Sequence, residues 1–191
     1  SDTDGLTLSG HSMLFVNAPL IFVAHRLSDV FAKQNNKTLR ETLAHRRYSA
    51  LSQSVAYQYP DDLDKPIGLF LAELKAIGDS TYRRFLNPHG DKTYCHFRLA
   101  DGENNGKKGL YLYLCNQEIV YIGRSYHPFS KRVDQGYGKI HPKNCFLDGQ
   151  STNCHLNSLI EEQHLSVSFY VCPMAENGVI ETTERALIQE R

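Results

Sequence analysis

The sequence predicts an α+β protein in which a mainly helical region over residues 1–100 precedes a small sheet with flanking helices over residues 101–191. Two observations indicate this division. Apolar residues recur at helical spacing in the first region, whereas strand-like alternation dominates two stretches of the second. A polar stretch rich in glycine and asparagine, residues 101–108, marks the approximate boundary.

Three helices are predicted in the first region. The first covers residues 19–34 and opens at Pro19, and the second follows a capping box formed by Thr38 and Glu41. The third covers residues 66–77 and is capped by Gly78. A strand over residues 93–99 then ends the region.

The second region opens with a hairpin over residues 109–124. Because side chains alternate along a strand, one face of its first strand carries three leucines and the other carries tyrosines. We expect the leucines to pack in the core. Tyr111 and Tyr121 lie directly opposite each other only if the turn has an odd number of residues, such as 115–117. A two-residue turn at Asn116 and Gln117 would place them on opposite faces.

A short helix after Pro128, a strand over residues 165–172 and a helix from about residue 181 complete the region. Arg132 shares the face of the short helix with Phe129. Glu184 lies at the edge of the apolar face of the last helix. Because acidic residues are rarely buried without a partner, we expect a metal ion or another cation beside Glu184.

The composition gives a neutral chain with local basic segments. At 191 residues and 41% hydrophobic, it can form one large domain or a compact domain with a helical extension, and we do not expect a disordered chain. Lysine plus arginine and aspartate plus glutamate each total 21, so net charge does not indicate a nucleic-acid partner. Residues 26–47 and 124–143 each carry four excess positive charges. These segments form either a polyanion-binding stripe or ordinary solvated helix faces.

No targeting or membrane segment is predicted. The apolar run over residues 13–24 is too short to span a bilayer and lacks a basic leader. Five cysteines without a C-x-x-C pair fit poorly with a secreted disulfide framework, so we expect a cytoplasmic protein.

Four residues of the second region are potential zinc ligands: Cys145, Cys154, His155 and Cys172. Their spacing matches no standard zinc site. We therefore favour thiols packed inside a folded loop.

Four motifs of the second region resemble those of the GIY-YIG nuclease superfamily, most closely its restriction-endonuclease members. They are G-L-Y at residues 109–111, Y-I-G at 121–123, S-K-R at 130–132 and E-R-A-L-I at 184–188. The resemblance covers residues 109–191. It implies a three-stranded, mainly antiparallel sheet flanked by helices, and phosphodiester hydrolysis at a single divalent metal, Mg²⁺ or Mn²⁺.

The resemblance also implies roles for individual residues. Tyr111 and Tyr121 would position or deprotonate the attacking water, and Arg132 would stabilise charge on the phosphate. Glu184 would be the single protein ligand to the metal, which suits a hard cation that keeps most of its waters. Arg124 would make a secondary phosphate contact.

The sequence departs from the family pattern at two places. Relatives often carry a histidine or tyrosine four residues after the helix arginine, where this chain has Gly136. Either Tyr137 or His141 takes that role, and we favour Tyr137 as the further catalytic residue. Relatives also tend to carry a proline and an asparagine a few residues beyond the last helix, which this sequence does not reach. Either an asparagine from elsewhere substitutes for it, or the sequence given is shortened.

Residues 137–160 are expected to form a loop inserted in the nuclease domain. Its amide, hydroxyl and basic side chains are of the kinds that read base edges and hold phosphates. The expected DNA contacts, together with those nearer the motifs, are Arg124, Lys131, Lys139, Lys143, Asn144, Gln150, Asn153 and His155.

The resulting prediction is a metal-dependent endonuclease that cuts double-stranded DNA at specific sequences. The helical region would grip DNA or pair two subunits, and a palindromic site would favour a homodimer or higher homo-oligomer. Two alternatives stay open: a structure-selective repair or recombination nuclease, and a non-catalytic DNA-binding protein on the same scaffold.

Overall fold

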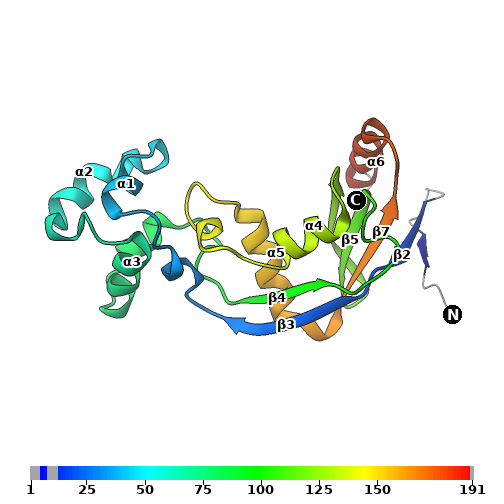
Figure 1. Cartoon of the computed structure of the whole chain (residues 1–191), viewed down its shortest axis with the longest axis horizontal. Coiled ribbons are helices and arrows are strands. Elements are labelled where there is room, and N and C mark those ends of the chain that lie inside the picture. The colour runs from blue at the N-terminus through cyan, green and yellow to red at the C-terminus, as the bar shows by residue number, and fades with distance from the viewer. Residues whose placement is uncertain (1–4, 8–12, 190–191) are drawn as a thin grey trace. The chain divides into compact units, whose positions relative to one another are not determined.

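The computed structural model describes residues 5–7 and 13–189, and the chain forms two compact units (Figure 1). Unit 1 combines the residues up to 25 with 95–139 and those from 159 onward, and unit 2 combines residues 26–94 with 140–158. The α+β class is confirmed. The division differs from the expected cut near residue 100, because each unit is assembled from separated segments.

Unit 1 is built on a five-stranded sheet in the order β1-β2-β7-β5-β6, with antiparallel neighbours. Its strands are β1 (Gly5–Thr7), β2 (Leu14–Asn17), β5 (Gly109–Cys115), β6 (Glu118–Ser125) and β7 (Val167–Pro173). The expected three-stranded sheet is therefore wrong. β5, β6 and β7 are the three expected strands, and β2 extends them by pairing Val16 with Val171.

The first predicted helix, over residues 19–34, is also wrong. Residues Leu20–Leu27 form strand β3, which pairs with β4 (Tyr94–Leu99) in a two-stranded sheet, and a 3₁₀ turn, η1 (Val30–Lys33), follows. Along β3 the more buried residues alternate with exposed ones. The apolar residues here fit both a helical and a strand period, and pairing with β4 decides in favour of the strand.

The other two predicted helices lie in unit 2, where the third is confirmed and the second is divided in two by a 3₁₀ turn over residues 46–48. Thr38 accepts a hydrogen bond from the backbone of Glu41 at 3.1 Å and caps α1 (Leu39–Leu43). Helices α2 (Ser49–Gln58) and α3 (Ile67–Ala76) follow, and Gly78 has the positive φ of 77° that suits a C-terminal cap. Two short 3₁₀ segments connect them, η2 (Arg46–Tyr48) and η3 (Pro60–Asp62), and a third, η4 (Ser80–Phe85), follows α3.

Residues 137–160, expected to form a loop, instead contain regular secondary structure. They include a 3₁₀ segment, η6 (Pro142–Cys145), and the helix α5 (Ser151–Glu162), which leads into η7 (His164–Ser166). Cys154, Leu156 and Ile160 are buried, and so are two asparagines of the same helix. Those buried amides interrupt the apolar pattern that would have revealed a helix.

Helix α6 (Asn177–Gln189) packs on one face of the unit 1 sheet, against β5 and β6. The core between them contains Phe15, Leu110, Leu112, Leu114, Ile122, Ile180 and Leu187. The leucine face of β5 is therefore the apolar face, as predicted. Within the described residues, no helix combines the length and apolar character needed to cross a membrane.

Candidate active site

The hairpin of β5 and β6 turns through two residues, so the expected odd-length turn is wrong. Asn116 and Gln117 both have positive φ angles, 51° and 67°, as tight hairpin turns require. Cys115 pairs with Glu118, but Tyr113 pairs with Tyr121 because a β-bulge shifts the register by one residue.

This bulge restores the common face that the two-residue turn would have destroyed. Tyr111 lies opposite Gly123, not directly opposite Tyr121. The rings of Tyr111 and Tyr121 are nevertheless stacked, with centroids 6.1 Å apart and planes 25° apart. The bulge, and not the length of the turn, therefore places Tyr111 and Tyr121 on the same face of the sheet.

Gly123 provides the space that the Tyr111 side chain occupies. A Cβ at this position would lie 2.3 Å from Cζ and 2.4 Å from Oη of Tyr111. Such an approach is far inside van der Waals contact, so any side chain here would displace the tyrosine. The glycine of Y-I-G thus has a steric role in placing a hydroxyl.

Tyr137 joins this group through an unusual helix. The short helix α4 (Phe129–Arg132) continues as the π-helix η5 (Val133–Tyr137). Because a π-helix has a wider turn than an α-helix, residues five apart fall on one face. Arg132 and Tyr137 therefore share a face that Gly136 would occupy in a regular α-helix. His141 lies just before η6 in unit 2, where its backbone N–H donates to Asn144 Oδ1.

The loop before β5 fixes the start of α4, a feature that the sequence did not reveal. The N–H of Phe129 donates to the carbonyl of Lys107 at 2.8 Å, and the N–H of Ser130 donates to that of Asn105 at 3.0 Å. These bonds satisfy two of the donors left free at a helix start. They hold the segment that carries Arg132.

Three tyrosine hydroxyls and one guanidinium converge. Tyr137 Oη lies 2.8 Å from Tyr111 Oη and 3.2 Å from Tyr121 Oη. Arg132 Nη2 donates to Tyr137 Oη at 2.8 Å, and its Nε donates to Tyr111 Oη at 3.4 Å. We call these four residues the tyrosine–arginine cluster.

The hydrogen bonds of the tyrosine–arginine cluster have a direction. Tyr137 accepts from Arg132 and donates its single proton to Tyr121, so Tyr111 must be the donor in its bond to Tyr137. The proton of Tyr121 is thereby left available for a ligand. Tyr121 is also half-buried, whereas Tyr111 and Tyr137 are fully buried. The chain of hydrogen bonds thus ends at its most accessible hydroxyl.

All three tyrosines of the cluster are held in the protonated form. Burial raises the pKa of Tyr111 to about 12. Burial also raises the pKa of Tyr121 and that of Tyr137. Near neutral pH these groups are hydrogen-bond donors, not bases.

Arg132 keeps its charge in this setting. Burial lowers the pKa of the guanidinium, but the oxygens of Tyr111 and Tyr137 more than offset that effect, and the pKa is raised overall. The side chain also lies over the Tyr137 ring, 4.7 Å from its centroid. A fixed positive charge therefore lies beside three donor hydroxyls.

Glu184 has the cationic neighbour that its position predicted, and that neighbour is Arg124. Arg124 Nη1 donates to Glu184 Oε1 at 3.1 Å and lies 3.9 Å from Glu181 Oε1. Burial raises the pKa of Glu184 above its ordinary value, although Arg124 lowers it. The charge of Glu184 in turn raises the pKa of Tyr121, after larger effects of burial and Tyr137, so the two groups belong to one region.

The floor of the cluster contains one unsatisfied group. Tyr113 packs edge-on against Tyr137 and Tyr111 and lies over Phe169, with ring centroids 5.7, 6.1 and 4.7 Å away. Its hydroxyl is the one fully buried side-chain oxygen or nitrogen, within the described residues, that has no hydrogen-bond partner. Tyr113 is therefore sealed from substrate.

The basic residues expected to contact DNA divide between the units. Arg124, Lys131 and Lys139 belong to unit 1, where both lysines are exposed and the Arg124 side chain is 35% exposed. The remaining predicted residues belong to unit 2.

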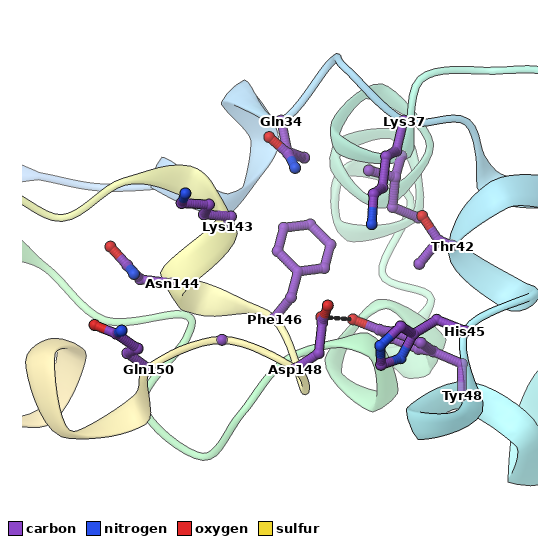
Figure 2. A pocket seen from close by; sticks show the side chains of 12 residues that line it. Gln34, Lys37, Thr42, His45, Tyr48, Lys143, Asn144, Phe146, Asp148 and Gln150 are labelled. Atoms are coloured by element: carbon purple, nitrogen blue, oxygen red, sulfur yellow. Dashed lines mark hydrogen bonds between the residues drawn. The ribbon is translucent and has the colours of Figure 1, made fainter.

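Unit 2 has a cavity of about 330 Å³, which we call the polar pocket (Figure 2). Lys143, Asn144 and Gln150 line it opposite Thr42, His45 and Tyr48, with Lys37 at its edge. Tyr48 donates a hydrogen bond of 2.6 Å to the one carboxylate of the lining, Asp148. Lys37 and Lys143 have no ion pair within the part of the chain that the structure describes, so they give the polar pocket a positive character.

Two of the predicted base-reading amides are occupied within the protein. Asn144 and Asn153 are buried, and they bond to the backbone N–H of His141 and to Gln150. His155 is exposed, with its ring 4.2 Å from that of His89. Cys145 and Cys154 are buried in the unit 2 core, as expected for inward-facing thiols.

Comparison of the chain with protein-family models, with curated proteins and with solved structures gives no match. The resemblance to GIY-YIG nucleases therefore depends on the four motifs and on the positions that their residues take.

Proposed function

We propose that this protein is a metal-dependent endonuclease that hydrolyses phosphodiester bonds in double-stranded DNA at specific sequences. The observation that carries the proposal is the convergence of Tyr111, Tyr121, Tyr137 and Arg132 on one side of the unit 1 sheet, with Glu184 nearby. A purely structural cluster does not require a buried cation among phenols. A phosphate-cleaving site does, because charge develops on phosphate oxygens in the transition state.

Each residue of the cluster supplies part of such a reaction. The Arg132 guanidinium clamps a phosphate oxygen, and the free proton of Tyr121 donates to another or orients a water. Because the tyrosines are protonated at neutral pH, they position the attacking water; a proton leaves that water only when a neighbouring charge lowers its pKa. Tyr111 and Tyr137 hold Arg132 in place through their hydroxyls.

Glu184 fits a hard divalent cation such as Mg²⁺ or Mn²⁺. Its side chain is 14% exposed, and the one hydrogen bond described for its carboxylate comes from Arg124 to Oε1. A single carboxylate with room for waters is the donor set that Mg²⁺ accepts. When bound, the metal supplies positive charge that acidifies water and offsets charge on the phosphate. Arg124 would then transfer from Glu184 to the DNA backbone.

The polar pocket of unit 2 supports contact with DNA beyond the reacting phosphate. Lys37 and Lys143 are suited to phosphate oxygens, and the amide nitrogen of Gln150, whose oxygen accepts from Asn153, is suited to an acceptor on a base edge. We expect the double variant Lys37→Ala/Lys143→Ala to bind duplex DNA more weakly. The slope of the logarithm of its binding constant against the logarithm of the salt concentration should be shallower by about two. Fluorescence anisotropy without metal measures this. Lys92→Ala, which removes an exposed lysine of unit 2 outside the pocket, is the control.

Plasmid DNA tests the activity directly. The protein is incubated with plasmid and Mg²⁺, and the ends of the products are sequenced. Discrete fragments with uniform termini are expected. Cleavage limited to junctions or flaps would instead identify a repair nuclease, and DNA binding without cleavage would identify a binding protein. Light scattering with and without DNA reports the homodimer that palindromic sites would require.

The metal role of Glu184 is tested by Glu184→Gln, matched with Glu176→Gln, a change at an exposed residue just before α6. Glu184→Gln should lower cleavage by about 10³-fold or more, because both metal affinity and charge neutralisation are lost. Glu176→Gln should cleave as the parent does. Equal cleavage by both variants would rule out the metal assignment.

A further inference from the structure

A second group of potential metal ligands lies in unit 1 and shares no residue with the tyrosine–arginine cluster or with Glu184. His25 belongs to β3, Glu161 to α5 and His164 to η7. One ligand atom from each lies within 4.8 Å of the other two. His25 Nδ1 is 2.9 Å from Glu161 Oε2, and the Glu161 side chain is only 9% exposed.

The two imidazoles are oriented by contacts that suit metal ligation. His164 Nδ1 lies 3.2 Å from the backbone carbonyl of Glu161, which leaves Nε2 of the same ring free as a ligand. Metal-binding histidines commonly donate their other ring N–H to a carbonyl in this way. The ring of His25 lies 4.3 Å from that of His164 and is stacked on Phe22, 5.2 Å away.

The carboxylate is supported from a third element. Cys95 of β4 is buried, and its thiol is hydrogen-bonded to Glu161; burial together with the charge of Glu161 raises the pKa of this thiol. Ligating carboxylates typically have such outer partners. Three separate segments of the chain, β3, β4 and the stretch that joins α5 to η7, therefore meet at Glu161, which is more organisation than a single surface ion pair shows.

We propose that His25, Glu161 and His164 bind a zinc-class divalent ion, distinct from the hard cation at Glu184. Two imidazoles and one carboxylate are the donors that Zn²⁺ and Co²⁺ prefer, whereas Mg²⁺ favours oxygen ligands alone. Ligands about 2.0–2.2 Å from a tetrahedral ion are roughly 3.5 Å apart, so small side-chain rotations close the observed spacing. The exposed side of His25 leaves the fourth position to water.

The site fastens β3 to the end of α5 behind the tyrosine–arginine cluster. Phe22 contacts Phe97, and Phe97 contacts Tyr113, with ring centroids 5.6 and 6.4 Å apart. A metal at this position would hold the wall against which Tyr113 packs. The bound metal would give structural support to the tyrosine–arginine cluster. This proposal does not depend on whether the protein is a nuclease.

The test uses metal-free protein and Co²⁺ or Zn²⁺ as the probe. Equilibrium dialysis should give one tightly bound ion per chain in the parent and in Glu184→Gln. His164→Gln should weaken binding by at least about 100-fold, more than loss of an outer partner costs. His127→Gln, at an exposed histidine of unit 1, should bind as the parent does. Retention in Glu184→Gln separates this site from the nuclease metal.

Thermal unfolding gives a second readout that needs no activity. Zinc at about a hundredfold excess over the parent's Kd should raise the Tm of the parent by about 5–10 °C, and the same concentration should raise that of His164→Gln by no more than about 2 °C. His164→Gln is chosen because it replaces the half-buried ring of His164 with an amide and buries no new charge. Absence of tight binding in the parent, or equal binding by His164→Gln, would overturn the proposal.

Discussion

The two faces of β5 are both buried, but for different purposes. Leu110, Leu112 and Leu114 belong to the apolar core between the sheet and α6. On the opposite face, Tyr111 and Tyr113 are equally buried. There the Tyr111 hydroxyl belongs to a hydrogen-bonded group of three tyrosine hydroxyls and one guanidinium. One strand thus contributes to a hydrophobic core on one side and to a preorganised polar cluster on the other.

This difference shows how the chain can tolerate a polar interior. Burying phenols and a guanidinium costs free energy unless each hydrogen bond is made. The leucine face provides burial free energy that offsets this cost. Changes on the leucine face should therefore appear mainly as lost stability, and changes on the tyrosine face mainly as lost activity.

The largest expected effect is on the tyrosine face. If the proposed function holds, Arg132→Ala should reduce DNA cleavage by about 10³-fold or more, because it removes the fixed charge that the phosphate would meet. Initial rates on plasmid with saturating Mg²⁺ measure this. The control is Arg98→Ala, at an exposed arginine of β4. If Arg132→Ala lost stability in proportion to its activity, the contrast between the two faces would fail.

The second effect belongs to the leucine face. Leu112→Ala should lower the free energy of unfolding by about 2–5 kcal/mol, because it leaves a cavity at a fully buried position. Denaturant unfolding measures the loss. At temperatures where the variant is still folded, its cleavage rate should equal that of the parent. A reduced rate in fully folded Leu112→Ala would show that the leucine face also sets the geometry of the hydroxyls.

A smaller effect, of opposite sign, is expected at the floor of the cluster. Tyr113→Phe removes a buried hydroxyl without a partner and should raise the free energy of unfolding by about 1 kcal/mol, because the penalty for that group disappears. Tyr137→Phe removes a bonded hydroxyl and should lower it by a similar amount. Denaturant unfolding of the two variants side by side is the measurement. If both substitutions lowered the free energy of unfolding, the Tyr113 hydroxyl would have a hydrogen-bond partner.

The sequence predicted the elements of this site better than their register. β5, β6, β7 and the face of α6 that carries Glu184 follow from alternation and helical spacing, which are local properties. The shared face of Tyr111 and Tyr121 depends on a bulge in β6, and the position of Tyr137 depends on a π-helix. Both are one-residue irregularities with no sequence signature of their own.

Longer-range features could not be read from the chain. Residues 19–27 have apolar positions compatible with helix or strand, and only pairing with β4 fixes the choice. The polar residues of α5 suggested a loop because their partners come from elsewhere in the fold. The meeting of His25 with Glu161 and His164 likewise depends on segments that are far apart in sequence.

The smallest effect concerns pH, and it tests whether Glu184 belongs to the polar face. Its folded pKa is raised, so ionisation of Glu184 costs the folded state stability as pH rises above the unfolded value of about 4.3. The amide introduced by Glu184→Gln does not titrate. The variant should therefore match the parent near pH 4 and exceed it in free energy of unfolding at pH 7, while Glu176→Gln shows no such trend. Saturating Mg²⁺ should reverse the order, because the metal binds only the ionised carboxylate. A difference that is independent of pH and of Mg²⁺ would place Glu184 outside the cluster's electrostatics and leave it a structural partner of Arg124.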